Sequence, residues 1–176
     1  MTTKDKSFIR NSRALVIMFT SVLLAALALL PAEAEGQAKP RLVKLAELKS
    51  VIESPGEEIR VINFWATWCG PCIKEMPLFE KLNAERKDVK VTLVSMDMDL
   101  DPKPEQVNRF VAKKKLMSSV LILDESNPNE WIEKIDKDWN GAIPATIVVN
   151  SKTGKRIFVE KELHEGDLEK LIAQVQ

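Results

Sequence analysis

Residues 64–73 read Phe-Trp-Ala-Thr-Trp-Cys-Gly-Pro-Cys-Ile, and both cysteines of the chain, Cys69 and Cys72, lie in this stretch. An apolar run over residues 61–65 leads into it, and a run typical of a helix follows over residues 73–86. The cysteine pair is therefore predicted where a buried strand gives way to the first turn of a helix. Unpaired backbone N–H groups and the helix dipole favour negative charge there, so we expect a reactive thiolate.

The C-x-x-C spacing argues against a structural disulfide and a metal site as the role of the two cysteines. A bridge across two intervening residues closes a very small loop, and stabilisation by a disulfide grows with loop length, so a structural staple is a poor explanation. A structural metal site usually takes four ligands. The single histidine, His164, lies far along the chain and is interpreted as a surface residue. Reversible thiol–disulfide exchange is the favoured interpretation, and it requires neither a metal nor a cofactor.

The residues of the motif can be given separate roles. Cys69, with its sulfur on the exposed side of the helix N-terminus, is predicted to be the nucleophile. Cys72, one turn into the helix and less exposed, is predicted to resolve the mixed disulfide. Gly70 is expected to permit close approach of the chain, and Pro71 sets a helical φ early in the helix. Trp68 is expected to shield the thiols.

Composition bounds the class of protein. The chain has 176 residues, of which 45% are hydrophobic and 30% charged, and its formal net charge is zero. These values are ordinary for one soluble globular domain preceded by a leader. The absence of excess positive charge argues against a nucleic-acid partner.

The first 34 residues have the pattern of an export signal. Residues 1–13 are polar and basic, residues 14–30 are uncharged and largely apolar, and Pro31-Ala32-Glu33-Ala34 ends in small residues. Residues 1–34 are therefore predicted to be a signal peptide, with an uncleaved membrane anchor as the alternative. Both place the rest of the chain in the periplasm or on the extracytoplasmic face of a membrane. Residues 35–41 are interpreted as a linker and residues 42–176 as the folded domain.

Hydrophobic periodicity predicts alternating helices and strands after residue 41. Pro77 falls inside the helix after the cysteines and should kink it. The alternation indicates an α/β fold, a mixed sheet with parallel strands and a C-terminal antiparallel hairpin. The predicted elements are helix 42–52, strand 58–66, helix 73–86, strand 89–96, helix 105–116, strand 119–123, helix 128–135, strands 145–149 and 155–159, and helix 167–175.

Two polar or aromatic features between these elements have ordinary interpretations. Asp97, Asp99 and Asp101 alternate along a loop but lack the glycine and terminal glutamate of a calcium loop, so we interpret them as solvated. Trp139 is interpreted as a core residue, with a place in a substrate groove as the alternative.

The string Asn-Phe-Trp-Ala-Thr-Trp-Cys-Gly-Pro-Cys-Ile-Lys-Glu-Met-Pro, residues 63–77, resembles the thioredoxin superfamily, and within it the TlpA/ResA-like exported thiol–disulfide oxidoreductases. The resemblance implies a thioredoxin-like fold over residues 42–176, with helices on both faces of the sheet. It also implies an extra helix and strand, which residues 97–139 would supply. Several members of this branch serve cytochrome c maturation.

The resemblance implies further site residues. Asn63 stands where cytosolic thioredoxins carry a buried aspartate, so it cannot carry their proton. Glu75, three residues after Cys72, corresponds to a glutamate near the thiols and is predicted to act as general base and acid. An acidic residue that merely favours the helix N-terminus is the alternative. Ile143–Pro144 is predicted to be a cis bond beside the cysteines, with Ile143 offering backbone groups to an extended substrate.

Together these features predict an extracytoplasmic thiol–disulfide oxidoreductase that reduces protein disulfides. Such a reductase needs a membrane-embedded electron donor. A periplasmic disulfide oxidant or isomerase is the alternative within this class. A Cu(I)-handling metallochaperone, with Met76 as the nearest soft ligand, is the alternative from another class, and a binding domain with vestigial cysteines is the third.

Overall fold

The computed structural model describes residues 39–99 and 103–176. The predicted signal peptide or anchor, residues 1–34, lies outside the described residues, as do most of the predicted linker and Asp101. Within the described part of the chain, no helix is both long and apolar enough to cross a bilayer.

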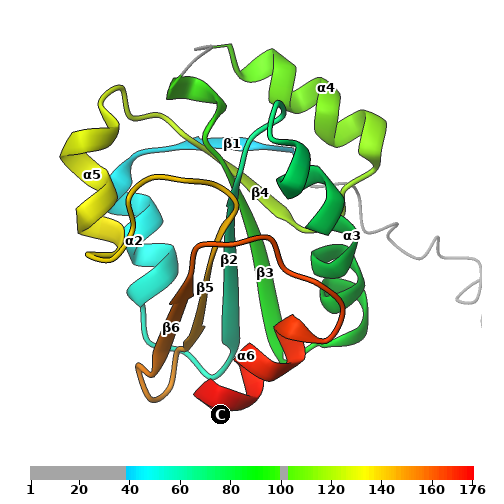
Figure 1. Ribbon diagram of the computed structural model, residues 1–176, viewed down its shortest axis with the longest axis vertical. Helices are drawn as coiled ribbons and strands as arrows, with labels where there is room; N and C mark the ends of the chain where they lie inside the picture. The colour runs from blue at the N-terminus through cyan, green and yellow to red at the C-terminus, as the bar shows by residue number, and fades with distance from the viewer. Residues whose placement is uncertain (1–38, 100–102) are drawn as a thin grey trace, which may run out of the picture. The chain divides into compact units, whose positions relative to one another are not determined.

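A six-stranded mixed sheet forms the centre of the described domain, with strand order β1-β4-β3-β2-β5-β6 (Figure 1). The first four strands in this order pair in parallel, and β5 and β6 add antiparallel pairs. This confirms the predicted α/β fold with its C-terminal hairpin. The elements are β1 Arg41–Val43, α2 Leu45–Glu53, β2 Ile59–Trp65, α3 Gly70–Glu85, β3 Val89–Ser95, the 3₁₀ turn η1 Asp97–Asp99, α4 Pro104–Lys114, β4 Ser119–Leu123, α5 Pro128–Ile135, β5 Ala145–Asn150, β6 Arg156–Val159 and α6 Asp167–Val175.

The first predicted helix is wrong at its start. Residues 41–43 form β1, which pairs in parallel with residues 121–123 of β4, and α2 begins only at Leu45. The predicted linker therefore ends inside a strand. Three residues are too few to show the two-residue alternation of a strand, and the backbone partners that stabilise β1 lie about 80 positions later in the chain.

The inserted segment adds a strand within the sheet. The chain between β3 and β5 contains α4, β4 and α5, and β4 lies between β1 and β3. This confirms the helix and strand predicted over residues 97–139. The chain just after α4 contacts α3, because the Met117 and Ser118 backbone N–H groups donate hydrogen bonds to Glu80, so the insertion reaches the helix that carries the cysteines.

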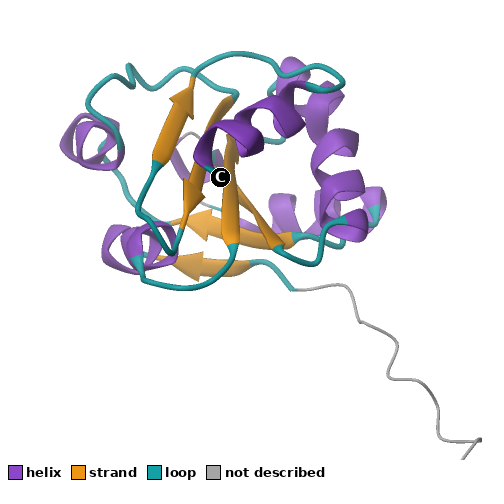
Figure 2. Ribbon diagram, turned by 90° about the horizontal axis from the view of Figure 1, so that it is seen from below, coloured by secondary structure: helices purple, strands orange, loops and turns teal. Residues whose placement is uncertain are grey.

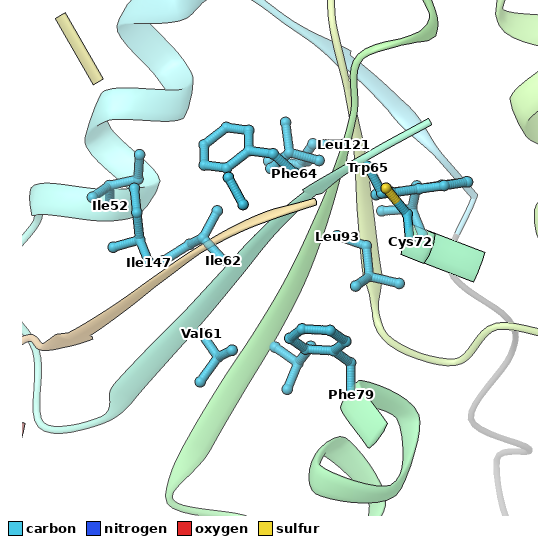
Figure 3. Packing of buried hydrophobic residues seen from close by; sticks show 14 of the residues in the cluster. Ile52, Val61, Ile62, Phe64, Trp65, Cys72, Phe79, Leu93, Leu121 and Ile147 are labelled. Carbon is cyan, nitrogen blue, oxygen red and sulfur yellow. The ribbon is translucent and has the colours of Figure 1, made fainter. Parts of the chain in front are cut away.

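Strand β2 is the central strand that leads to the cysteines. Its residues alternate between two covered faces, as a near-continuous apolar run predicts. Asn63 bonds to Glu75 of α3, so the odd-numbered residues face α3 and α6, whereas Ile62 and Phe64 point to the opposite face. Figure 2 shows helices on both sides of the sheet, and Figure 3 shows Phe79 of α3 on one side of β2 and Ile52 of α2 on the other.

Aromatic rings fill the second face near the end of β2. The ring of Phe64 lies 4.5 Å from that of Trp139, and Trp131 of α5 packs 5.8 Å from Trp139. Trp139 is 2% exposed, which confirms its predicted place in the core. These contacts anchor the chain just before Pro144 against the strand that leads to the cysteines.

Candidate active site

The two cysteines lie where β2 passes into α3, as predicted. Cys69 is the N-cap of α3 and forms a disulfide with Cys72, with sulfurs 2.01 Å apart. The backbone N–H of Cys72 points at Cys69 Sγ, 3.3 Å away. Cys69 is the more exposed of the pair, but at 5% against 0% it is less exposed than expected. A negative sulfur at Cys69 would therefore meet a helix N–H in a partly dry setting.

The Ile143–Pro144 peptide bond is cis, which confirms the prediction. The Ile143 carbonyl oxygen lies 3.8 Å from Cys69 Sγ, so this loop forms a wall of the site. Trp139 donates a hydrogen bond from Nε1 to the Ala142 carbonyl at 2.8 Å and holds the loop from the core side. The site thus combines two segments more than seventy residues apart in sequence.

Three residues of the motif frame the outer side of the disulfide. Trp68 exposes 55% of its surface, so its ring lies largely in solvent at the rim of the site. A Cβ built on Gly70 would meet no atom within 4 Å. The expected close approach of the protein's own chain to Gly70 is therefore wrong, and the free space there is open to a second molecule. Pro71 occupies the first turn of α3, where its missing N–H costs little.

Glu75 is buried beneath this surface, with only 1% of its area exposed. Its Oε1 accepts a hydrogen bond from Asn63 Nδ2 at 2.8 Å, and its Oε2 accepts one from the Leu163 backbone N–H at 2.6 Å. Asn63 Nδ2 also approaches Thr146 Oγ1 at 3.1 Å. A solvated acid at a helix N-terminus, the alternative interpretation of Glu75, does not fit this burial.

Desolvation dominates the titration of Glu75. Burial raises its pKa from the ordinary value of 4.5 to about 7, and the hydrogen bonds from Leu163 and Asn63 oppose the rise only in part. A carboxyl with this pKa gains and loses a proton near neutral pH. Since Cys72 and Glu75 are three residues apart on α3, they share a helical face. The arrangement brings an acid–base group into the neighbourhood of the inner sulfur.

Asp97 is a site feature that sequence reasoning missed. It was expected in a solvated loop, but it is 2% exposed and begins the turn η1 directly after β3. Its two carboxylate oxygens accept hydrogen bonds from the Thr67 backbone N–H at 3.1 and 3.0 Å, and one also accepts from the Thr67 hydroxyl. The partner lies thirty residues earlier, and no local pattern in the sequence indicates this contact.

The described residues around the disulfide include no cluster of metal-binding side chains. Across residues 39–99 and 103–176, no three His, Cys, Asp or Glu side chains gather closely enough to hold an ion. Met76, the nearest soft side chain after the cysteines, is 4% exposed. The described site contains a cysteine pair that can exchange two electrons, the titratable carboxyl of Glu75 and the backbone carbonyl of Ile143 beside the sulfur.

Comparisons with known proteins agree with this chemistry. The Redoxin family model matches residues 41–171. The chain is 30% identical over 139 residues to the thioredoxin-like protein YneN of Bacillus subtilis (strain 168), which covers 77% of this chain and 74% of that protein. It is 33% identical over 90 residues to the thiol-disulfide oxidoreductase ResA of Halalkalibacterium halodurans, over 51% of this chain and 46% of ResA.

A solved structure supports the same assignment. The thioredoxin-related protein from Neisseria meningitidis serogroup B superposes with a TM-score of 0.59 at 25% identity, over 69% of this chain and 87% of that one. The Redoxin match spans most of the chain and includes both cysteines. The chain therefore belongs to the Redoxin family and is a thiol–disulfide oxidoreductase of the TlpA/ResA-like branch of the thioredoxin superfamily.

Proposed function

We propose that this oxidoreductase reduces protein disulfides outside the cytoplasm, with Cys69 as nucleophile and Cys72 as resolving thiol. The Cys69 thiolate attacks one sulfur of a substrate disulfide, which forms a mixed disulfide and releases one substrate thiolate. Cys72 then attacks Cys69 Sγ, releases the second substrate thiolate and forms the Cys69–Cys72 disulfide. Two electrons pass to the substrate, whose two sulfurs take up two protons.

The observation that carries this proposal is the place of Cys69 Sγ between the helix N-terminus and the Ile143 carbonyl. The sulfur is 3.3 Å from the Cys72 backbone N and 3.8 Å from the Ile143 oxygen. A nucleophile there is next to backbone groups that an extended substrate strand can pair with. We propose that this substrate strand contacts five residues around the sulfur: Trp68, Gly70, Pro71, Ile143 and Pro144.

Glu75 is proposed to move the proton of Cys72. In the resolving step the Cys72 thiol must lose its proton before it attacks, and an ionised carboxylate with a pKa of about 7 can accept it. When the protein is reduced again, the carboxyl returns the proton to the Cys72 sulfur. The asparagine at position 63 has no proton to exchange and serves as a donor to Glu75.

The cellular setting is part of the proposal. The basic, apolar and small-residue pattern of residues 1–34 supports export by a signal peptide, or retention by an anchor. A reductase in an oxidising compartment needs electrons delivered across the membrane, so a membrane-embedded dithiol donor is the proposed partner. Cytochrome c maturation, in which apocytochrome thiols must be kept reduced, is the proposed pathway on the strength of the resemblance described above.

Trapping tests the substrate side of the proposal. In Cys72→Ser the mixed disulfide on Cys69 cannot be resolved, so a natural substrate stays attached and can be identified after purification from the envelope of the source cell. Cys69→Ser under the same conditions is the control and should trap nothing. Equal yields from the two variants would contradict the assigned roles of the cysteines.

The reduction potential tests the direction of electron flow. A value near the figure of about −270 mV that thioredoxin shows supports a reductase. A value near about −120 mV, as in a strong disulfide oxidant, would replace the proposed reductase with an oxidant. Redox equilibration with glutathione or dithiothreitol buffers, followed by thiol labelling, measures it.

A further inference from the structure

The loop between β2 and α3 is held in place from the end of the neighbouring strand. Residues 66–68 connect Trp65 to Cys69, and the Cys69 backbone N–H closes a turn onto the Ala66 carbonyl at 3.1 Å. The second attachment is at Thr67, whose backbone N–H and hydroxyl both donate to Asp97. The loop that delivers the nucleophile is thus fixed by one buried carboxylate.

Asp97 is itself oriented by groups on its own segment. Ser95 Oγ donates to Asp97 Oδ2 at 2.8 Å, and the Asp97 backbone N–H donates back to Ser95 Oγ at 3.2 Å. Ser95 is fully buried at the end of β3 and pairs in register with Trp65 of β2. The carboxylate therefore has a rigid base in the sheet, directly beside the strand end from which the loop departs.

The network continues into the inserted segment. Gln106 of α4 donates from Nε2 to Thr67 Oγ1 at 2.9 Å, so the Thr67 hydroxyl accepts from α4 while it donates to Asp97. Phe110, one turn further along α4, packs its ring 5.1 Å from that of Trp65. The insertion thus contacts the nucleophile's loop through a polar chain and an aromatic contact.

We propose that Asp97 is a positioning residue for the thiol–disulfide reaction, which acts through Thr67 to hold Cys69 at the N-terminus of α3 and against the Ile143 carbonyl. The inference rests on the proposed function of Cys69 as nucleophile. A solely structural role would require only that Asp97 stabilise the fold. The bonds here converge instead on the residue two positions before the nucleophile, from the strand end on one side and from α4 on the other.

The direction in which neutralising Asp97 changes the rate of Cys69 alkylation distinguishes a positioning role from a direct effect of its charge. A carboxylate near Cys69 disfavours a second negative charge, so neutralising it would by itself raise the thiolate fraction and speed alkylation. Loss of positioning acts the other way, because the sulfur spends less time at the helix N–H groups that stabilise the thiolate. We expect the second effect to dominate, since Asp97 accepts hydrogen bonds from both donors of Thr67, its backbone N–H and its hydroxyl.

The experiment compares four variants of the reduced full-length protein: Asp97→Asn, Thr67→Val, Thr67→Ser and Glu80→Gln. Glu80 is the matched control, because its carboxylate also accepts two backbone N–H groups, from Met117 at 2.7 Å and Ser118 at 3.1 Å, but lies far along α3 from the cysteines. Cys69 alkylation by iodoacetamide and reduction of a peptide disulfide are measured, together with thermal unfolding.

Asp97→Asn and Thr67→Val should alkylate Cys69 about tenfold more slowly, with kcat lowered to a similar degree, as expected for a misplaced reacting group. Thr67→Ser, which keeps both donors, should behave as wild type, and Glu80→Gln should unfold earlier without losing Cys69 reactivity. Faster alkylation in Asp97→Asn, or equal effects in Asp97→Asn and Glu80→Gln, would overturn the inference. Alkylation needs no substrate, so a wild-type protein that reduces no peptide disulfide would refute the proposed function and leave this comparison intact.

Discussion

Replacing Glu75 with Gln tests the physical account of the buried carboxyl through stability. The unfolded chain releases the Glu75 proton near its ordinary pKa of 4.5, whereas burial keeps it bound in the folded chain until about pH 7. Between these values the folded state binds more protons, so the free energy of unfolding falls as pH rises. The full interval corresponds to up to about 3 kcal/mol, and any water that reaches the carboxyl lowers this figure.

Glutamine keeps the shape of the side chain and removes the titration. Its oxygen can still accept from the Leu163 N–H, and Asn63 can turn its amide so that its own oxygen accepts from the new NH₂ group. Any residual mismatch shifts the stability of Glu75→Gln by a constant at all pH values. The expected result is therefore a pH-dependent difference: the variant gains stability relative to wild type as pH rises from 4 to 8, most steeply between 4.5 and 7.

Urea unfolding of the oxidised proteins at steps from pH 4 to 8.5 measures this difference. In the oxidised state the cysteines do not titrate, so they add nothing to it. Glu58 and Asp88, whose pKa values are lowered to about 2 mainly by hydrogen bonds from Arg60 and Arg86, affect both proteins alike and cancel. A difference that stays constant across this range would refute the raised pKa and with it the proton-carrying role.

Three further outcomes are expected. In stopped-flow measurements of the resolving step, Glu75→Gln should slow attack by Cys72 about 100-fold, the low end of general-base effects, and abolish the rise in rate near pH 7; an unchanged profile would leave Glu75 without a role in proton transfer. Trp139→Phe removes the Nε1 bond to Ala142 and part of a buried ring, so in urea unfolding it should cost about 1 kcal/mol for the bond and a further amount for the cavity, with slower substrate reduction because the cis-proline loop loosens; full retention of both would contradict the anchoring role. Phe79→Ala empties a fully buried core position and should cost about 3–5 kcal/mol, checked by the same denaturation assay against Leu42→Ala on the exposed edge, which should cost far less.

The parts of the fold with strong local signals could be predicted from the sequence. Strand β2 shows a near-continuous apolar run before the cysteines, interrupted by Asn63, and α6 shows four apolar residues at helical spacing, so the sequence places both to within a residue or two. Strand β1 could not be placed this way. Its three residues are stabilised by parallel pairing with β4, and a pattern within one segment carries no information about a partner 80 residues away.

The residues of the site likewise fall into those that the sequence predicts and those that it does not. The C-x-x-C motif predicts the roles of Cys69 and Cys72, and the family resemblance predicts the cis bond before Pro144. The burial of Glu75 depends on the Leu163 backbone N–H, and that of Asp97 on Thr67, and both partners come from distant segments. An acidic side chain in a polar loop gives no sign that it will be covered. For this reason the sequence favours a solvated Asp97, although its carboxylate accepts hydrogen bonds inside the protein.

The antiparallel register of β2 and β5 has a consequence for engineering chain length. Asn63 pairs with Thr146, and Phe64 with Ala145. Because Cys69 follows β2 and Pro144 directly precedes β5, this register sets how the thiol and the proline lie relative to each other. Adding or deleting one residue within β2, just before Trp65, would shift the end of the strand by one register position relative to β5, about 3.3 Å. Residues between β4 and α5 lie outside this pair of strands, so a tag or grafted loop placed there should leave the spacing of sulfur and proline intact.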